Sequence, residues 1–304
     1  PTSRRFFLLL KALARNIDPD ILADKTSIHP WFIARLKEIV NTKQELSHFD
    51  LHNINKTILA KAKENGISDE HIASILKADA AKIRNIRENF GLKPFFKDIA
   101  SNNNTKTQAT FYSTCHAQEN KNLARQNTIL VLGAGSNRIG EGSGFDTCSY
   151  QAGIALGKTD FSSVFVNCNP RAVSTAPDVF DRIYLEPLSA EYLQNICDQE
   201  KPQGMIVQFG GNQALQAACA LKDKAPAILG TSLKSMQHGE RPELFRNLLK
   251  DLGIPQPKSA LAGSIEEALN IARDIGFPLF IKPAHKQAAD KNEIILNQEM
   301  FDDF

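Results

Sequence analysis

The pattern of hydrophobic and polar positions changes once along the chain, near residue 127. Before that point apolar residues recur every three or four positions, which predicts amphipathic helices up to about residue 99. One of these helices carries four apolar residues on a single face: Phe32, Leu36, Ile39 and Val40. Polar, aperiodic stretches at 101–110 and 118–126 are expected to be connecting segments on the surface.

From residue 127 onward, short continuous apolar runs predict buried parallel strands. They lie at 128–132, 163–166, 204–207 and 227–229, with helical stretches between them at 150–158, 190–200 and 213–222. This alternation predicts an α/β fold, a doubly wound parallel sheet with helices on both faces. Beyond it, helices near 243–251 and 265–275 and strands at 278–283 and 293–296 begin a further region.

Composition and charge narrow the class of protein. The 304 residues are 42% hydrophobic and 23% charged, as in a globular protein of about two domains, and no apolar run approaches the roughly 18 residues of a membrane span. The net charge of +2 combines +7 over residues 1–126 with −5 over residues 127–304. Because the lysines of the basic part are spread among acidic residues, we expect a solvated helical surface, and neither nucleic acid nor a membrane as a partner.

The cysteines and the single tryptophan favour structural roles. Five cysteines are scattered without a C-x-x-C pair or metal-ligand spacing, so we expect no metal site and buried free thiols in a reducing compartment, the cytoplasm or an organelle matrix. Cys168, which lies in a turn between two asparagines, is expected to be an inert buried thiol. Trp31 is expected to anchor a hydrophobic core rather than to contact a ligand.

A glycine-rich turn, residues 133–140, follows the first predicted buried strand. Arg138 stands at the third glycine position of a dinucleotide fingerprint, and no Gly-Lys-Ser/Thr follows, so neither a dinucleotide site nor a P-loop is predicted. The turn can hold an anion through its backbone N–H groups and a cationic side chain, which makes Gly133, Gly135, Asn137 and Arg138 candidate site residues. A tight strand–helix turn with a solvated arginine explains the same residues equally well.

Two more turns, at the carboxyl ends of later predicted strands, carry amides and glycines. One contains Asn167 and Asn169, and the other contains Gln208, Gly210 and Gly211. Because open α/β sheets place their ligands at the carboxyl ends of the strands, these residues are further candidates for a substrate or anion site. A single Asn-Pro turn is usually only a turn, but several such turns together favour a binding crevice.

The residues in and around these turns resemble the large subunit of carbamoyl phosphate synthetase. The matching segments, in the order that family shows, are 133–142, 145–146, 167–170, 173–175, 181–187, 201–202, 207–208, 210–211 and 228–232. In the helical part, residues 30–32, 83–84 and 112–114 resemble the oligomerisation domain of that subunit and its exit. The resemblance spans nearly the whole chain, and its motifs are specific in combination.

The resemblance implies a division into four segments. Residues 1–112 would be the helical oligomerisation domain, 113–126 a linker, 127–238 a parallel α/β pre-ATP-grasp domain, and 239–304 the truncated beginning of an ATP-grasp domain. In the last of these segments, Lys282 and Arg241 would contact the phosphates of ATP.

The family reaction forms carbamoyl phosphate from bicarbonate, glutamine-derived ammonia and ATP, for pyrimidine and arginine synthesis. The resemblance therefore implies ATP and Mg²⁺ (or Mn²⁺) as cofactors, and a glutaminase small subunit and the remainder of the large subunit as partners. It also implies a homo-oligomer formed through the helical domain. Catalysis would rest on positioning and electrostatic stabilisation of phosphoryl transfer.

Several residues depart from the family's pattern. Lys282 stands where arginine is usual, Pro242 stands where a nucleotide-binding arginine is expected, with Arg241 one place off, and residues 285–291 lack the glycines expected over the phosphates. The Mg²⁺-binding carboxylates would lie beyond Phe304. We therefore expect no synthesis of carbamoyl phosphate by this chain unaided, and the sequence identifies no catalytic residue.

Two functions of different classes stay open at this point. The first is a segment of a synthetase large chain that contributes oligomerisation and part of the second active site, and the turns at Arg138 and Asn167 favour it. The second is a non-catalytic oligomerisation or regulatory module on the same fold, which the missing glycines and arginine favour. A nicotinamide-dependent oxidoreductase is disfavoured because Arg138 replaces the third glycine.

Overall fold

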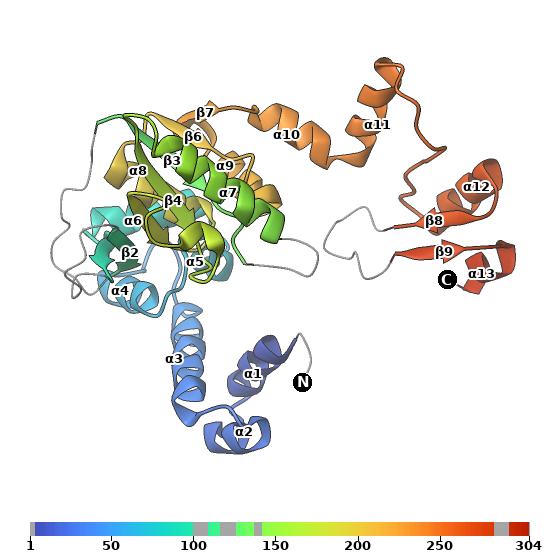
Figure 1. Cartoon of the computed structure of the whole chain (residues 1–304). Helices are drawn as coiled ribbons and strands as arrows, with labels where there is room; N and C mark the ends of the chain where they lie inside the picture. Colours follow the sequence, from blue (N-terminus) through green and yellow to red (C-terminus); the bar gives the residue numbers. More distant parts are fainter. Residues whose placement is uncertain (1–3, 100–108, 116–125, 137–141, 283–291, 304) are drawn as a thin grey trace. The chain divides into compact units, whose positions relative to one another are not determined.

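The structure is a computed structural model that describes residues 4–99, 109–115, 126–136, 142–282 and 292–303. The chain divides into two compact units, Pro1–Gly230 and Thr231–Phe304 (Figure 1). In the described residues, the first unit holds a set of helices and a seven-stranded sheet, and the second holds four helices and a two-stranded sheet.

The described part of the first unit begins with six helices. They are α1 (Arg5–Ala14), α2 (Pro19–Thr26), α3 (Pro30–Leu46), α4 (Lys56–Glu64), α5 (Asp69–Leu76) and α6 (Ala80–Asn89). Their beginnings follow local chemistry, because Asn55, Ser68 and Asp79 accept backbone N–H groups at the starts of α4, α5 and α6. Pro19 and Pro30 occupy the first helical position of α2 and α3. The predicted helices are confirmed up to Asn89.

The six helices pack in two groups. Leu13, Ile33 and Val40 belong to a buried cluster formed by α1, α2 and α3. A second cluster, which includes Leu59 and Ile72, joins α4, α5 and α6 to the end of α3. Helices this short are marginal alone in water, so their stability comes mainly from this packing.

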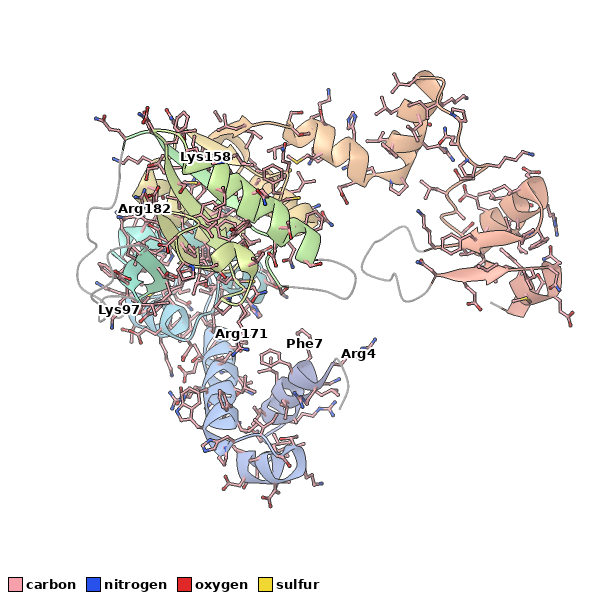
Figure 2. All side chains as sticks on the ribbon, viewed as in Figure 1. Arg4, Phe7, Lys97, Lys158, Arg171 and Arg182 are labelled. Carbon is pink, nitrogen blue, oxygen red and sulfur yellow. The ribbon has the colours of Figure 1, made fainter. Side chains whose placement is uncertain are left out.

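Trp31 and Phe32 are not part of either cluster. Their side chains are 56% and 57% exposed, and their rings lie edge to face with centroids 5.0 Å apart. The expectation that Trp31 anchors a core is wrong, because α1 and α2 pack on the side of α3 that carries Ile33 and Val40. Phe7 of α1 is also exposed, at 70%, so α1 and α3 both present apolar surface (Figure 2).

The sheet has the strand order β1-β2-β5-β4-β3-β6-β7. Its strands are β1 (Phe95–Asp98), β2 (Ala109–Thr114), β3 (Thr128–Leu132), β4 (Ser162–Asn167), β5 (Arg182–Leu185), β6 (Gly204–Ile206) and β7 (Ala227–Leu229). All neighbouring strands are parallel except the antiparallel pair β1–β2. Every residue of β3 is buried, as its continuous apolar run predicts. The predicted α/β class is confirmed, with a mostly parallel sheet.

Three helices connect the parallel strands, α7 (Ser143–Leu156), α8 (Ala190–Glu200) and α9 (Gly211–Leu221), with short 3₁₀ turns η1 (Val173–Thr175) and η2 (Lys222–Lys224). The crossover from β3 to β4 runs through α7 toward one edge of the sheet. The crossover from β5 to β6 runs through α8 and places β6 on the opposite side of β3. Because such crossovers are right-handed, α7 covers one face of the sheet and α8 and α9 cover the other. In agreement, α8 and α9 contact each other.

Strands β1, β2 and β5 are not among the strands that the sequence predicts. β2 lies in the region predicted to be helical domain and linker, yet it pairs in parallel with β5, with Phe111 opposite Tyr184. The sequence of β2 gives no clear strand pattern, because Phe111 is the one fully buried residue of this strand. The helical pattern therefore ends at Asn89, and residues 95–98 and 109–114 extend the sheet instead.

The second unit contains α10 (Leu233–Glu240), α11 (Pro242–Asp251), α12 (Ile265–Ile275), β8 (Leu279–Ile281), β9 (Glu293–Ile295) and α13 (Gln298–Asp303). The two strands pair antiparallel, with Phe280 opposite Ile294. The helices and strands predicted for this region are present, together with the additional helices α10 and α13. Ala272 and Ile295 are its buried apolar residues among those described.

Candidate functional site

The strand order reverses between the neighbouring strands β3 and β6. The connection after β3 leads to β4 on one side, and the connection after β6 leads to β7 on the other. In open α/β sheets a crevice forms at the carboxyl ends of the strands at such a switch point, and ligands bind there. The turn after β3 begins with Gly133, the turn after β6 spans 207–210, and β4 ends at Asn167. All three sequence-predicted turns therefore lie at one edge of the sheet, which we call the switch crevice.

Hydrogen bonds tie the turn after β3 to the end of β4. The backbone N–H of Gly135 donates to Asn167 Oδ1 at 3.0 Å, and the N–H of Gly133 donates to the carbonyl oxygen of Val166 at 2.8 Å. The Asn167 side chain is fully buried, and its Nδ2 atom has no hydrogen-bond partner in the described part of the chain. An unpaired buried donor of this kind costs about 1–3 kcal/mol, which a ligand oxygen would recover.

Glycine is required where the turns after β3 and β6 approach each other. Gly135 has φ +76°, and a Cβ atom there would collide with the carboxamide oxygen of Gln213 in α9. A Cβ atom at Gly210 would lie 2.5 Å from the carbonyl oxygen of Gly133. The two turns therefore form one continuous wall of the switch crevice, and Gly211 packs there against the ring of Phe145.

The other candidate residues of this region have more local surroundings. Asn169 Oδ1 accepts the backbone N–H of Arg171 at 3.0 Å, which is the hydrogen bond of an ordinary Asx turn. The carboxamide of Gln208 lies against Gly230 at the end of β7. Asn137 and Arg138 lie outside the described residues.

Lys282 and Arg241, the candidate phosphate contacts, belong to the second unit. Lys282 directly follows β8 and Arg241 directly precedes α11, and both residues are exposed. Neither side chain has an ion-pair or hydrogen-bond partner among the described residues. No described contact brings these two cations together.

Glu186, at the end of β5, is a buried residue that sequence reasoning did not single out. Its backbone N–H donates to the carbonyl oxygen of Asn167 at 3.2 Å, and its carboxylate accepts the backbone N–H of Ser113 in β2. Burial raises the pKa of Glu186 to about 7. The only signal in the sequence is a glutamate directly after an apolar strand, within a motif quoted for its resemblance.

The thiols differ from expectation. The five cysteines are free, but Cys148 and Cys168 are exposed, and Cys197 is the one fully buried. The expectation that Cys168 is a buried thiol is therefore wrong, because Cys168 follows Asn167, the last residue of β4, and lies outside the buried strand. Burial does raise the pKa of Cys197 to about 12, which leaves that thiol protonated.

The chemistry of the described residues limits which cofactors they can hold. No group of three or more His, Cys, Asp or Glu side chains is placed to bind a metal ion in the described ranges. None of the described helices is long and apolar enough to cross a membrane.

Family models match the chain in three consecutive stretches. The oligomerisation domain of the carbamoyl-phosphate synthetase large chain matches residues 1–91, the carbamoyl phosphate synthase preATP-grasp domain matches 125–238, and the ATP binding domain of the synthase L chain matches 242–304. This chain belongs to the carbamoyl phosphate synthase large-chain family. The switch crevice lies within the preATP-grasp match, and Lys282 lies within the ATP-binding match.

Curated large chains of carbamoyl phosphate synthase align with nearly all of this chain. The one from Archaeoglobus fulgidus is 37% identical over 307 residues, which covers 98% of this chain and 28% of its own length. The one from Caldanaerobacter subterraneus subsp. tengcongensis is 39% identical over 288 residues, covering 94% of this chain and 26% of its own length. The chain thus spans 26–28% of the length of these relatives.

Similarity to a solved structure is more distant. N5-carboxyaminoimidazole ribonucleotide synthetase from Thermus thermophilus matches 58% of this chain and 42% of its own, at 17% identity and a TM-score of 0.43. That similarity is too low to inform the site.

Proposed function

We propose that this chain works as a segment of a carbamoyl phosphate synthase large chain, in the ATP-dependent formation of carbamoyl phosphate from bicarbonate and ammonia. The observation that carries the proposal is the order of the three family matches, which follow one another from residue 1 to residue 304 and leave only 92–124 and 239–241 unmatched. Because the chain spans 26–28% of its curated relatives, it would act together with the remaining segments of such a large chain.

In this proposal the switch crevice holds a small oxyanion or carbonyl compound such as bicarbonate or carbamate. The unpaired Nδ2 of Asn167 would donate to one of its oxygens, held in place by the hydrogen bond from Gly135 to Oδ1 of the same side chain. Arg138, which lies outside the described residues, carries a charge that suits such an anion. Fixed donors of this kind stabilise charge without reorganisation during the reaction.

We further propose that ATP phosphates contact Lys282 and Arg241. Both are exposed cations without a partner among the described residues, and both lie within or beside the ATP-binding match. Lysine is a point charge without the bidentate geometry of arginine, so Lys282 would hold a phosphate less firmly than arginine does. Mg²⁺ or Mn²⁺ would have to be held by residues other than those described.

The partners and setting follow from the same proposal. A glutaminase small subunit would supply ammonia, and the remaining large-chain segments would complete the active sites, for pyrimidine and arginine synthesis in the cytoplasm. Copies of the chain would associate through the helical region, where Phe7, Trp31 and Phe32 leave apolar surface exposed.

A non-catalytic oligomerisation or regulatory module is the second candidate. It is favoured by Lys282 in place of arginine and by the absence of glycine from residues 285–291. Such a module would keep the helical region and the sheet but would not process ATP.

The requirement for further segments is tested by calorimetry on the purified chain. ATP is titrated with and without Mg²⁺, and the same protein is assayed for carbamoyl phosphate from ATP, bicarbonate and ammonia. We expect no saturable Mg²⁺-dependent heat at submillimolar ATP and no product, because the chain spans only 26–28% of its relatives' length and Lys282 lacks the bidentate geometry of arginine. Tight Mg²⁺-dependent binding or turnover by the chain alone would overturn this requirement.

A further inference from the structure

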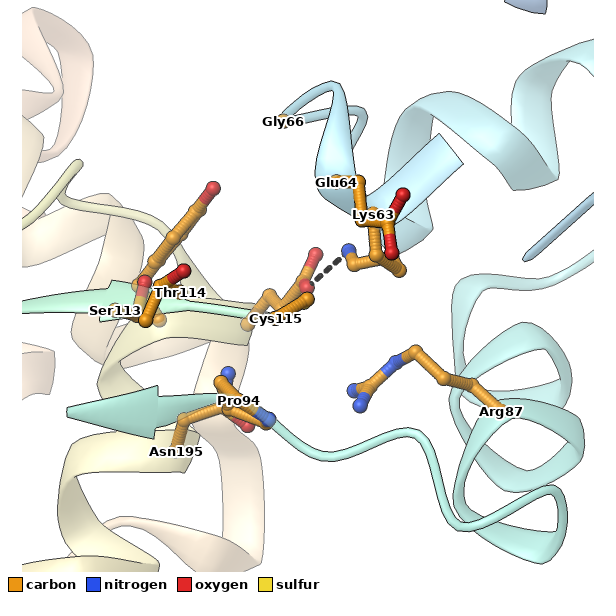
Figure 3. A pocket seen from close by; sticks show the side chains of 11 residues that line it. Lys63, Glu64, Gly66, Arg87, Pro94, Ser113, Thr114, Cys115 and Asn195 are labelled. Atoms are coloured by element: carbon orange, nitrogen blue, oxygen red, sulfur yellow. Dashed lines mark hydrogen bonds and ion pairs between the residues drawn. The ribbon is translucent and has the colours of Figure 1, made fainter. Parts of the chain in front are cut away.

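A cavity of about 160 Å³ lies inside the first unit, where α4 and α6 meet β2 and α8 (Figure 3). We call it the junction cavity, and its wall includes Lys63, Arg87, Ser113, Tyr192 and Asn195. A second hollow of about 380 Å³ shares Arg87 and Asn195 with it. The junction cavity is separate from the switch crevice, because no residue of the switch crevice lines either hollow.

The charged groups of the junction cavity other than Glu64 are already paired. Lys63 Nζ lies 2.5 Å from Glu191 Oε1, and Arg87 binds Asp69 at 2.9 Å through Nη2. Lys63 also reaches Asp69 at 3.1 Å, so two cations and two carboxylates form one buried network. A charged ligand would have to separate one of these pairs, and breaking a buried ion pair costs several kcal/mol. The exposed carboxylate of Glu64 at the cavity wall disfavours an anion further.

Two neutral polar groups of the same wall are not paired. Asn195 is only 8% exposed, and its side-chain amide makes no hydrogen bond to another described residue. The hydroxyl group of Tyr192 likewise has no such partner among the described residues. Burial raises the pKa values of Tyr192 and Cys115, so these side chains also present neutral groups.

An asparagine amide offers one oxygen acceptor and an NH₂ donor side by side. A group that satisfies both at once presents an acceptor next to an N–H donor, as the N7 and N6 amino group of adenine do in DNA readout. Another amide edge, with its carbonyl oxygen next to an N–H, has the same arrangement. A cavity of about 150 Å³ admits a benzene-sized molecule, so the size of the junction cavity suits a ligand of roughly six heavy atoms.

We propose that the junction cavity binds a small uncharged molecule through a carboxamide or lactam group. The ligand's carbonyl oxygen and N–H pair with the Asn195 amide, and the Tyr192 hydroxyl contacts the rest of its polar surface. The paired charges of Lys63, Arg87, Asp69 and Glu191 hold the helical and sheet walls of the cavity together without contributing net charge.

Ligand-observed NMR on the purified 304-residue chain tests this proposal. The probes are propionamide and pyrrolidinone, with propionate and N,N-dimethylpropionamide as analogues that carry a charge or lack the N–H. We expect saturable binding of the first two in the millimolar range, as suits ligands of so few atoms, and binding about tenfold weaker for the analogues.

Variants locate the binding. Asn195→Leu keeps the side-chain volume and should weaken propionamide binding about tenfold, whereas Asn85→Leu on the exposed side of α6 should leave it unchanged. Tyr192→Phe removes only a hydroxyl and serves as a second test if the leucine variant does not fold; a severalfold loss is expected. Three results would overturn the proposal. Propionate could bind as tightly as propionamide, or binding could be unaffected by Asn195→Leu and Tyr192→Phe. The third is no saturable signal from any probe, because the cavity would then hold only water.

Discussion

Gly135 lies in the turn after β3, with a left-handed backbone and close to the carboxamide of Gln213 in α9. An alanine there must adopt φ +76° and place its methyl group against Gln213. We expect Gly135→Ala to lower the free energy of unfolding by about 1–2 kcal/mol, which is the usual cost of a left-handed residue with a Cβ atom. The measurement is urea unfolding followed by circular dichroism.

Gly144→Ala is the matched control for that variant. Gly144 lies in the first turn of α7, has no left-handed φ, and leaves open space around an added Cβ atom. The alanine there should leave stability unchanged or raise it by up to about 1 kcal/mol. Equal effects at both glycines would contradict the role assigned to Gly135.

Glu186 makes stability depend on pH. Its pKa of about 7 exceeds the usual 4.5, so the folded chain keeps a proton that the unfolded chain loses between these two values. The contribution of this group to stability is therefore complete below pH 4.5 and is lost as the pH rises through 7, by up to about 3 kcal/mol. Glu186→Gln does not titrate and keeps an oxygen for the Ser113 N–H.

The stability of Glu186→Gln relative to the wild type should therefore increase from about pH 5 to about pH 8. Urea unfolding at both pH values measures the difference, with Glu70→Gln, an exposed glutamate of α5, as the control whose difference stays flat. A difference for Glu186→Gln that is independent of pH would show that the carboxylate ionises normally in the folded chain.

Single residues are predicted well where a local rule acts and poorly where burial decides. The glycines of the switch crevice follow from local backbone chemistry. Trp31 and Cys168 differ from expectation because their exposure depends on which neighbours cover them. No local pattern carries that information.

At the scale of elements, Arg87 joins α6 to α5 from a fully buried position. Its guanidinium donates to Asp69 at 2.9–3.1 Å and to the carbonyl oxygen of Leu92. We expect Arg87→Met to destabilise the first unit by about 3–5 kcal/mol, because Asp69 is then left buried with only Lys63 to balance it. Urea unfolding measures the loss, and hydrogen exchange of the α5 amides should increase with it.

Arg84→Met, one turn earlier on the same helix, is the control. Arg84 pairs with Glu88 and with Asp198, whose side chain is 59% exposed. Because both carboxylate partners are at least 36% exposed to solvent, these pairs are largely screened and contribute at most about 1 kcal/mol, so this variant should remain close to the wild type. Similar losses in both variants would mean that the Asp69 pair is not the stronger link.

The elements that sequence analysis recovers are those with continuous or strongly periodic apolar patterns. β3 and β4 are nearly all buried and are predicted, whereas β1 at the edge of the sheet and β2 next to it each hold only one fully buried residue and are not predicted. β5 is recognised only as a motif, because two of its buried residues are polar. Arg182 and Tyr184 donate hydrogen bonds to Glu200 of α8, and they replace part of the apolar pattern. A strand that pairs its polar groups inside the fold cannot be read from hydrophobicity.

At the scale of the whole molecule, the sequence separates a helical part from an α/β part, and the structure joins them in one compact unit. The joining contacts, Lys63 with Glu191 and Arg84 with Asp198, link residues more than a hundred positions apart. Such pairs leave no trace in local patterns, so neither the joint nor the junction cavity could be predicted. The switch crevice could be, since its location follows from strand order alone.

The central claim, that this chain carries out a large chain's work in carbamoyl phosphate formation, is tested most directly in a chimera. The chain replaces its aligned segment in the Archaeoglobus fulgidus large chain, and carbamoyl phosphate is measured from ATP, bicarbonate and ammonia. We predict product formation that falls at least about tenfold with Asn167→Leu, which removes the unpaired donor of the switch crevice. A folded chimera that forms no product, or one that Asn167→Leu leaves unchanged, would contradict the account.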